Sequence, residues 1–269
     1  MRPGAVLAAA SLVGAAVLTA CITAPEPRRP AAQGYVEMET IRALAADLPA
    51  PPVAGSPGDL ADREASDALK RWEDTDRWLL AGAQAELRPP LALQHFDCAL
   101  GVRTADAEVP ALKRLAERVM RDAVTLAEAA DRFQRPRPVV EDPQRRACIR
   151  LDPATRARSA WPARPALYGA AYAEALALAA PDRAEAVRAI GRAIGDSAAV
   201  CALNRPADVA AGAALGQALA AEQAQVADYR ADASAAGAEI AALRAGGRTH
   251  PGCAAERRAL AQPVAGDGR

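Results

Sequence analysis

Arginine and proline gather in three short segments of the sequence, at points where helices are expected to begin or end. The segments are residues 135–138 (Arg-Pro-Arg-Pro), 159–166 and 195–212. A helix N-terminus offers unpaired backbone N–H groups to an anion, and the arginine fork matches the shape of phosphate and carboxylate groups. The third segment adds the polar side chains of Ser197, Asn204 and Asp208. Together the segments predict a site for an anion.

The scarcity of histidine limits what such a site can do. The chain contains only two histidines, His95 and His250, and neither lies in these segments. Most metal sites and acid–base sites that depend on histidine are therefore excluded. Lys plus Arg and Asp plus Glu each number 33, so the formal net charge is zero. Proteins that bind nucleic acid usually carry a basic excess, and we therefore expect no nucleic-acid partner.

In order and spacing the three segments resemble the PAP2 superfamily, and in particular the bacterial class A non-specific acid phosphatases. That family's pattern is K-x6-R-P, then P-S-G-H, then S-R-x5-H-x3-D. Arg137 and Pro138 match R-P, and Pro162 matches the start of the second motif. Ser197 and Asp208 match the two ends of the third motif. The resemblance covers residues 45 to about 260, with similar flanks at residues 48–52, 96–101, 200–201 and 208–212.

Four positions depart from the family pattern. Ala130 replaces the lysine of the first motif, and Pro165 replaces the histidine of the second. In the third motif Ala198 replaces arginine and Asn204 replaces histidine. The resemblance implies that the third-motif histidine attacks phosphorus, that Asp208 orients it, and that the second-motif histidine protonates the leaving group. Asn204 has no basic lone pair and Pro165 has no side-chain proton, so neither can take these roles.

We therefore expect no intact catalytic residue, and Asn204, Asp208 and Pro165 mark remnant positions. The related vanadium haloperoxidases need the same histidine, so that activity is not expected either. An active phosphomonoesterase would need an unfamiliar residue set, for instance direct attack by Asp208. The candidates for holding phosphate or another small anion are Arg135, Arg137, Arg164, Arg205 and Ser197. In the alternative, these arginines are solvated or pair with Asp196, Asp208 and Glu141, and Asp208 caps a helix.

The N-terminus has the features of an export signal. Met1 and Arg2 precede an apolar stretch, residues 5–18, that is too short to span a bilayer. The stretch ends in Leu-Thr-Ala-Cys21, which resembles the bacterial lipoprotein signal, so Cys21 is the expected lipidation site. Ile22, in place of an aspartate, favours a periplasmic protein anchored at the outer membrane. An ordinary secretory signal is the alternative.

Four cysteines remain after Cys21, an even number in an oxidising compartment. Two disulfides are expected among Cys98, Cys148, Cys201 and Cys253, and the sequence permits three pairings. His95 and His250 each stand three residues before a cysteine, so a His2Cys2 zinc site with Cys98 and Cys253 is an alternative. We favour a bridge between those two cysteines, and we expect no metal or cofactor.

Helical signals dominate the sequence. Hydrophobic residues make up 51% of the chain and aromatic residues only 3%, and alanine, the strongest helix former, leads the apolar set. The fold class we expect is an all-α helical bundle of the PAP2/acid phosphatase type, without strands or a transmembrane segment in the mature chain. Asp59 is expected to cap the first helix of the series. The expected helices cover residues 59–87, 110–133, 167–180 and 181–194, followed by 207–221 and 222–244 or one long helix across both.

These observations divide the chain into four parts. A lipoprotein signal peptide is expected over residues 1–20, a lipidated N-terminus and flexible tether over 21–45, the acid-phosphatase-like helical domain over 46–260, and a disordered tail over 261–269. The favoured function is that of a lipid-anchored periplasmic protein that has lost turnover but retains anion binding. The alternatives are an active acid phosphatase with a non-standard site and a structural envelope lipoprotein. No protein partner is indicated.

Overall fold

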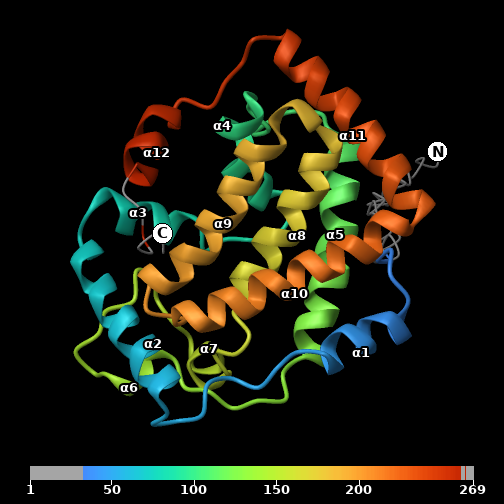
Figure 1. Cartoon of the computed structure of the whole chain (residues 1–269). Helices are drawn as coiled ribbons and strands as arrows, with labels where there is room; N and C mark the ends of the chain where they lie inside the picture. Colours follow the sequence, from blue (N-terminus) through green and yellow to red (C-terminus); the bar gives the residue numbers. More distant parts are fainter. Residues whose placement is uncertain (1–32, 262–263, 265–269) are drawn as a thin grey trace, which may run out of the picture. The chain divides into compact units, whose positions relative to one another are not determined.

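The computed structural model describes residues 33–261 and residue 264, and every regular element in this part of the chain is a helix (Figure 1). The all-α prediction is confirmed. The predicted signal peptide and the lipidation site at Cys21 lie outside the described residues. So does most of the predicted tail. None of the described helices combines the length and the apolar character needed to cross a membrane.

One helix, α8 (Arg164–Ala179), lies at the centre of the bundle. It packs against α5 (Pro110–Ala129), α9 (Ala184–Val200), α10 (Pro206–Gln225) and α11 (Ala227–Ala245), and Figure 1 shows it between α9 and α5. Its apolar residues are spread around the helix, with Leu167, Tyr172 and Leu176 all buried. A helix that is apolar on all sides is typical of such a central position.

Glycine allows α8 and α10 to approach closely. A Cβ atom on Gly212 would lie 2.2 Å from the carbonyl oxygen of Ala163, and one on Gly216 would lie 2.4 Å from that of Leu167. Both separations are far below van der Waals contact, so no other residue fits without moving backbone. The two helices, and the loop before α8, are therefore fixed relative to each other by backbone contact.

A short helix precedes the region where the domain was expected to begin. Helix α1 (Met38–Ala46) packs on α5 and buries Ile41 and Ala45. The prediction of a flexible tether up to residue 45 is therefore wrong for residues 38–45, because Ile41 and Ala45 on one face of this helix are buried against a partner surface. The rest of the predicted tether lies mostly outside the described residues.

The helix predicted over residues 59–87 is interrupted. The structure has α2 (Pro57–Ala68), a 3-10 helix η1 (Leu69–Trp72) and α3 (Asp76–Ala83) in its place. Asp74 adopts a left-handed φ of 62°, and the side chain of Thr75 then caps α3 by accepting from the Trp78 N–H. The cap of α2 is Ser56, whose Oγ accepts from the N–H of Asp59, so the prediction of Asp59 as N-cap is also wrong.

The other predicted helices exist with shifted ends. Helix α5 ends at Ala129 and not at 133, and α9 runs on to Val200 and not 194. The single long helix considered across 207–244 is wrong, because the backbone is extended at Val226 (φ −83°, ψ 127°). The remaining elements are η2 (Leu91–Phe96), α4 (Asp97–Leu100), α6 (Pro138–Glu141), α7 (Pro153–Ala157), η3 (Pro181–Arg183) and α12 (Cys253–Leu260).

Two disulfides link segments that are distant in sequence. Cys98, on α4, is joined to Cys253 at the start of α12. Cys148 is joined to Cys201, just after α9. The predicted disulfides are therefore confirmed, and the pairing is one of the three that the sequence allowed.

Candidate functional site

The three arginine- and proline-rich segments meet at the start of α10. The N–H of Ala163 donates to the carbonyl of Asp208 over 2.9 Å, and the N–H of Ala160 donates to that of Arg135 over 2.8 Å. A third backbone bond, 3.1 Å long, runs from Val139 to the carbonyl of Ala202. Segments separated by dozens of residues are thus tied together by main-chain hydrogen bonds.

Asn204 lies where these segments meet and is almost fully buried, with 1% exposure. Its Nδ2 donates to the carbonyl oxygen of Ala160 over 2.6 Å, and its Oδ1 has no partner among the described residues. The amide side chain therefore ties the loop before α10 to the loop before α8. A donor held in this way cannot act as a nucleophile.

Asp208 is fully buried in the first turn of α10. Its Oδ2 accepts from the backbone N–H of Arg205 over 2.7 Å, so it forms half of a capping box at this helix. Burial raises the pKa of the Asp208 carboxyl, while the charge of Arg135 opposes this shift. The capping role considered for Asp208 is present in the structure.

Arg135 is enclosed by carboxylates. Its guanidinium donates to Asp208, to Asp62 over 2.8 Å and to Asp59 over 3.1 Å, and the arginine is 6% exposed. Asp62 also accepts from the backbone N–H of Ala207 over 2.8 Å. We call Arg135 with these three aspartates the acid ring. The positive charge of Arg135 is therefore already neutralised by carboxylates of the protein itself.

The guanidinium of Arg137 is hydrogen-bonded to backbone carbonyl groups. It donates from Nε to Thr155 over 2.9 Å and from its two terminal nitrogens to Leu203 over 2.9 Å and Ser159 over 3.2 Å. Burial lowers the pKa of Arg137 to about 10. All three nitrogens of the guanidinium already hold loop carbonyls, so this side chain clamps two of the three segments.

The two remaining candidate arginines also have carboxylate partners. Arg205 donates to the carbonyl of Pro136 over 2.9 Å and to Glu141. Glu141 is held from its other side by Arg63, 2.7 Å away. Arg164 pairs with Asp131 over 3.0 Å, and its side chain is 18% exposed. The predicted pairing with Asp208 and Glu141 is therefore observed, whereas Asp196 forms no ion pair with these arginines.

Ser197 belongs to a different network, which the sequence did not indicate. Its Oγ accepts from the guanidinium of Arg77 over 2.9 Å and lies 2.6 Å from Oε1 of Gln84 and 2.7 Å from the carbonyl of Ala193. Arg77, Gln84 and Ser197 are each at most 2% exposed. Both Arg77 and Gln84 lie within the helix predicted over residues 59–87. That prediction used the spacing of the apolar residues, and it gave no indication that these two polar residues are buried. The structure does not bring Ser197 into contact with the side chains of the acid ring.

Three of the positions that depart from the motif pattern carry side chains with no ionisable or hydrogen-bonding group. Ala130 is completely buried and Ala198 is 4% exposed, while Pro165 lies in the first turn of α8. Both histidines of the chain lie elsewhere. His95 contacts the carbonyl of Glu86 through Nε2 over 2.7 Å, and Nδ1 of His250 accepts from the Gly252 N–H over 3.1 Å.

A cavity of about 210 Å³ lies beside this region and is reached by Arg205. Its wall is formed by Arg63, Ser66, Asp67, Pro138, Glu141, Asp142, Arg145 and Arg205. Asn204, Arg135 and Arg137 are not part of that wall. The other remnant positions, Pro165 and Asp208, do not line this opening either.

No family model matches the chain. Among curated proteins, the chain is similar to an acid phosphatase of Zymomonas mobilis subsp. mobilis, with 27% identity over 203 residues. The similar region covers 75% of this chain and 77% of that protein. This similarity supports an acid-phosphatase-like relationship.

Proposed function

We propose that this chain is a catalytically inactive member of the acid phosphatase lineage, which serves in binding or as a structural protein and not in turnover. The observation that carries the proposal is Asn204. It occupies the position of the attacking histidine in the motif pattern, and its Nδ2 donates a hydrogen bond to the carbonyl of Ala160. Loss of a nucleophile alone can reduce the rate about 10⁶-fold, and Pro165 removes the proton donor as well.

Direct attack by Asp208 does not offer a way around this loss. Its carboxylate is 0% exposed, one oxygen caps α10 and the other receives Arg135. A nucleophile must come within about 3–3.5 Å of the reacting atom. The burial of Asp208 and the two bonds that hold it argue against such an approach.

The internal pairs also argue against tight phosphate binding at the acid ring. An added phosphate would have to displace Asp59, Asp62 and Asp208 from Arg135, and each of these carboxylates would then lose a buried partner. Arg164 is a second candidate for an anion contact, because it is partly exposed and begins α8. Its ion-pair partner is Asp131, whose side chain is 30% exposed. Residual anion binding is proposed there and not at Arg137.

The cellular setting remains part of the proposal. The Leu-Thr-Ala-Cys21 sequence supports a lipid anchor on Cys21 and an outer-membrane protein that faces the periplasm. Metabolic labelling with a radioactive fatty acid should mark the full-length protein. A Cys21→Ala variant should carry no label, and equal labelling of the variant would exclude this anchor.

Hydrolysis of an aryl phosphate by purified protein tests the loss of turnover. Across pH 4 to 9 we expect release of the phenol at the rate seen in buffer alone. The comparison variants are Asn204→Ala, which removes the remnant position, and Arg137→Ala, which removes a motif residue. Turnover above buffer that disappears in both variants, with their helical content unchanged, would overturn the proposal.

Phosphate titration followed by the unfolding temperature tests the anion contact. Wild-type protein should be stabilised slightly by phosphate, and Arg164→Ala should abolish the effect. Equal stabilisation of both proteins would exclude Arg164 as the contact.

A further inference from the structure

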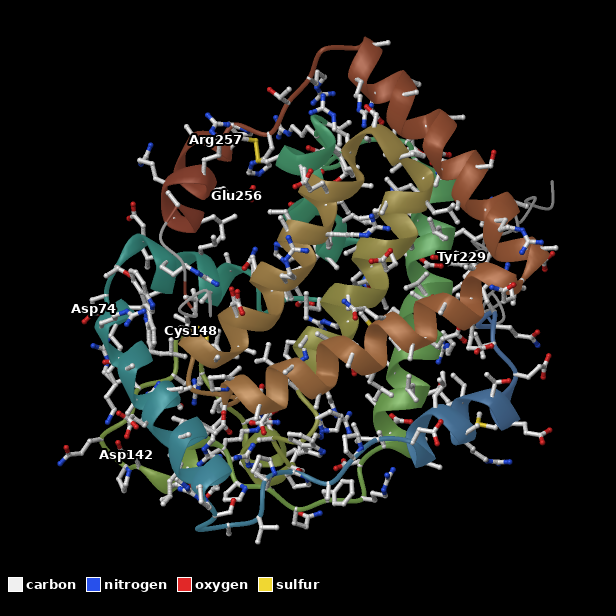
Figure 2. The ribbon with its side chains drawn as sticks, in the orientation of Figure 1. Asp74, Asp142, Cys148, Tyr229, Glu256 and Arg257 are labelled. Carbon is white, nitrogen blue, oxygen red and sulfur yellow. A yellow bond between two sulfur atoms is a disulfide. The ribbon has the colours of Figure 1, made fainter. Side chains whose placement is uncertain are left out.

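The two His-x-x-Cys sequences, which the proposed function does not use, lie on the two sides of one disulfide. Cys98 is joined to Cys253, and His250 precedes Cys253 by three residues. Both sulfurs and a ring nitrogen of His250 all lie within 4.8 Å of one another. Figure 2 shows the disulfide as a yellow bond close to Arg257 on α12.

We propose that reduction of the Cys98–Cys253 disulfide converts this cluster into a site for Zn²⁺, with Cys98, Cys253 and His250 as ligands. Two thiolates and an imidazole are a ligand set that zinc prefers, and the fourth position would be taken by water. This inference does not depend on the proposed loss of phosphatase activity.

The distances in the cluster fit this use. Zinc binds sulfur at about 2.3 Å and nitrogen at about 2.0–2.1 Å, so two ligand atoms of one tetrahedral zinc lie about 3.5–3.8 Å apart. The ring nitrogen of His250 therefore lies at most about 1.3 Å farther from either sulfur than zinc needs, and the two sulfurs, bonded to each other in the disulfide, must move apart on reduction to reach this separation. Residues of α4 and α12 supply the ligands, so the metal would join the same two segments that the disulfide joins.

The surroundings of the cluster give access to a reductant and to the metal. Cys98, His250 and Cys253 are each only partly buried. His250 also borders a cavity of about 520 Å³ between α3, η2 and α12. Cys201 of the other disulfide is 1% exposed and lies in an apolar cluster with Trp72 and Trp78. Its partner Cys148 is partly exposed, whereas both sulfurs of the Cys98–Cys253 bridge belong to partly exposed residues. Because reduction depends on access to a sulfur, the Cys98–Cys253 bridge should be reduced first.

His95 borders the same cavity but is not one of the proposed ligands. It lies outside the group of mutually close ligand atoms, and its Nε2 is bonded to the carbonyl of Glu86. It has the same spacing to its cysteine as His250 has to Cys253. His95 therefore provides a matched control for the role of His250.

The chemistry balances with a phosphine as the reductant. The phosphine takes the oxygen of one water molecule and becomes a phosphine oxide, while the S–S bond breaks and two thiols form. Zinc then forms two S–Zn bonds and one N–Zn bond, and the two thiol protons leave to solvent. In a cell, a dithiol could take the place of the phosphine and become a disulfide itself.

The test uses the full chain, reduced by a phosphine without oxygen, and titrated with Co²⁺ as a spectroscopic substitute for zinc. We expect one Co²⁺ per chain, with a thiolate-to-metal absorption band that Zn²⁺ abolishes by competition. The oxidised protein should bind none. Absence of the band in the reduced protein, or an equal band in the oxidised protein, would overturn the proposal.

Two pairs of variants assign the ligands. His250→Ala should weaken binding by at least about 100-fold, because even loss of a ligand's supporting partner costs about 10–100-fold, whereas His95→Ala should leave the affinity unchanged. Cys98→Ala with Cys253→Ala should abolish the band, whereas Cys148→Ala with Cys201→Ala should keep it. His250 is partly exposed, so circular dichroism should show a folded variant. Equal affinity of the two histidine variants would exclude His250 as a ligand and refute the site.

Discussion

Two buried arginines of this protein are held in opposite ways. Arg135 lies in the acid ring and donates to three aspartates from α2 and α10. Arg77 is even less exposed, at 2%, yet it donates only to the hydroxyl of Ser197 and the carbonyl of Ala193. Its Nε has no partner among the described residues. Burial lowers the pKa of Arg77, whereas the pKa of Arg135 is raised despite burial, because the aspartates outweigh it.

The two arginines therefore differ in their partners: the charge of Arg135 is neutralised by three carboxylates, whereas Arg77 is hydrogen-bonded only to neutral groups. The acid ring neutralises a cation at a place where the motif pattern would have kept cations free for a phosphate. Arg77 has no such partner, since Asp196 acts on it only through its charge. Removal of Arg135 should therefore leave buried anions behind, and removal of Arg77 should not.

The largest effect is expected for Arg135→Met. Three carboxylates would lose their common partner, and breaking a buried ion pair from one side costs about 3–5 kcal/mol. Urea unfolding followed by circular dichroism measures the loss. Arg164→Met is the control, because its partly exposed pair should contribute under about 1 kcal/mol. Equal losses for the two variants would show that the acid ring does not hold the fold together.

A smaller effect is expected for Asp208→Asn. Asparagine keeps an oxygen for the Arg205 N–H, and Arg135 keeps Asp59 and Asp62. Because burial raises the pKa of Asp208, the ionised form has little net advantage in the folded protein. The unfolding free energy should fall by about 1–1.5 kcal/mol, the size of one hydrogen bond. A loss as large as that of Arg135→Met would contradict this ranking.

Arg77→Met should change stability by less than about 1 kcal/mol, because it removes a buried charge that has no hydrogen-bonded carboxylate and costs only neutral hydrogen bonds. Ser197 would still bond to Gln84 or to the carbonyl of Ala193. The same urea titration serves as the measurement. A loss of several kcal/mol would reveal that Asp196 pairs with Arg77 more closely than the structure indicates.

The last effect is confined to acid pH. Burial acts to raise the pKa of Asp59, but hydrogen bonds from Arg63, the Gly55 N–H and Arg135 outweigh it and lower the value from 3.8 to about 2. A lowered pKa means that this group's stabilisation is present above pH 3.8 and is lost as the pH falls through about 2. Thermal unfolding of Asp59→Asn should therefore be less sensitive to pH in this window than unfolding of the wild type. Parallel curves would exclude Asp59 as a contributor.

The sequence was most informative where proline marks a helix start. Pro110 and Pro206 begin α5 and α10 in the structure, close to the predicted positions. The break at Asp74 was missed, because no glycine or proline marks it and it depends on the packing of the helices around it. The break at Val226 was predicted only as one of two alternatives, and about four residues too early. Length and periodicity favour a continuous helix across Asp74.

The candidate site was only partly predictable, for a related reason. The meeting of Arg137, Asn204 and Asp208 was implied by a motif pattern, and main-chain bonds hold these segments together. The partners Asp59 and Asp62 lie more than 70 residues away from Arg135 on a helix whose acidic residues suggest a solvated face. Their spacing of three residues places both carboxylates on one face of the helix. Only the packing of α2 against α10 shows that this face is buried and lies against Arg135.

The contact of Gly212 with the Ala163 carbonyl has a consequence for protein engineering. This contact fixes the backbone that carries positions 163–165 and 208, so the framework around Asn204 is already assembled without a reactive group in it. An engineer who wishes to install new chemistry could leave the main chain as it is. The work would consist of exchanging side chains at positions 130, 165, 198 and 204, and of removing Asp59 and Asp62, which now help to neutralise Arg135.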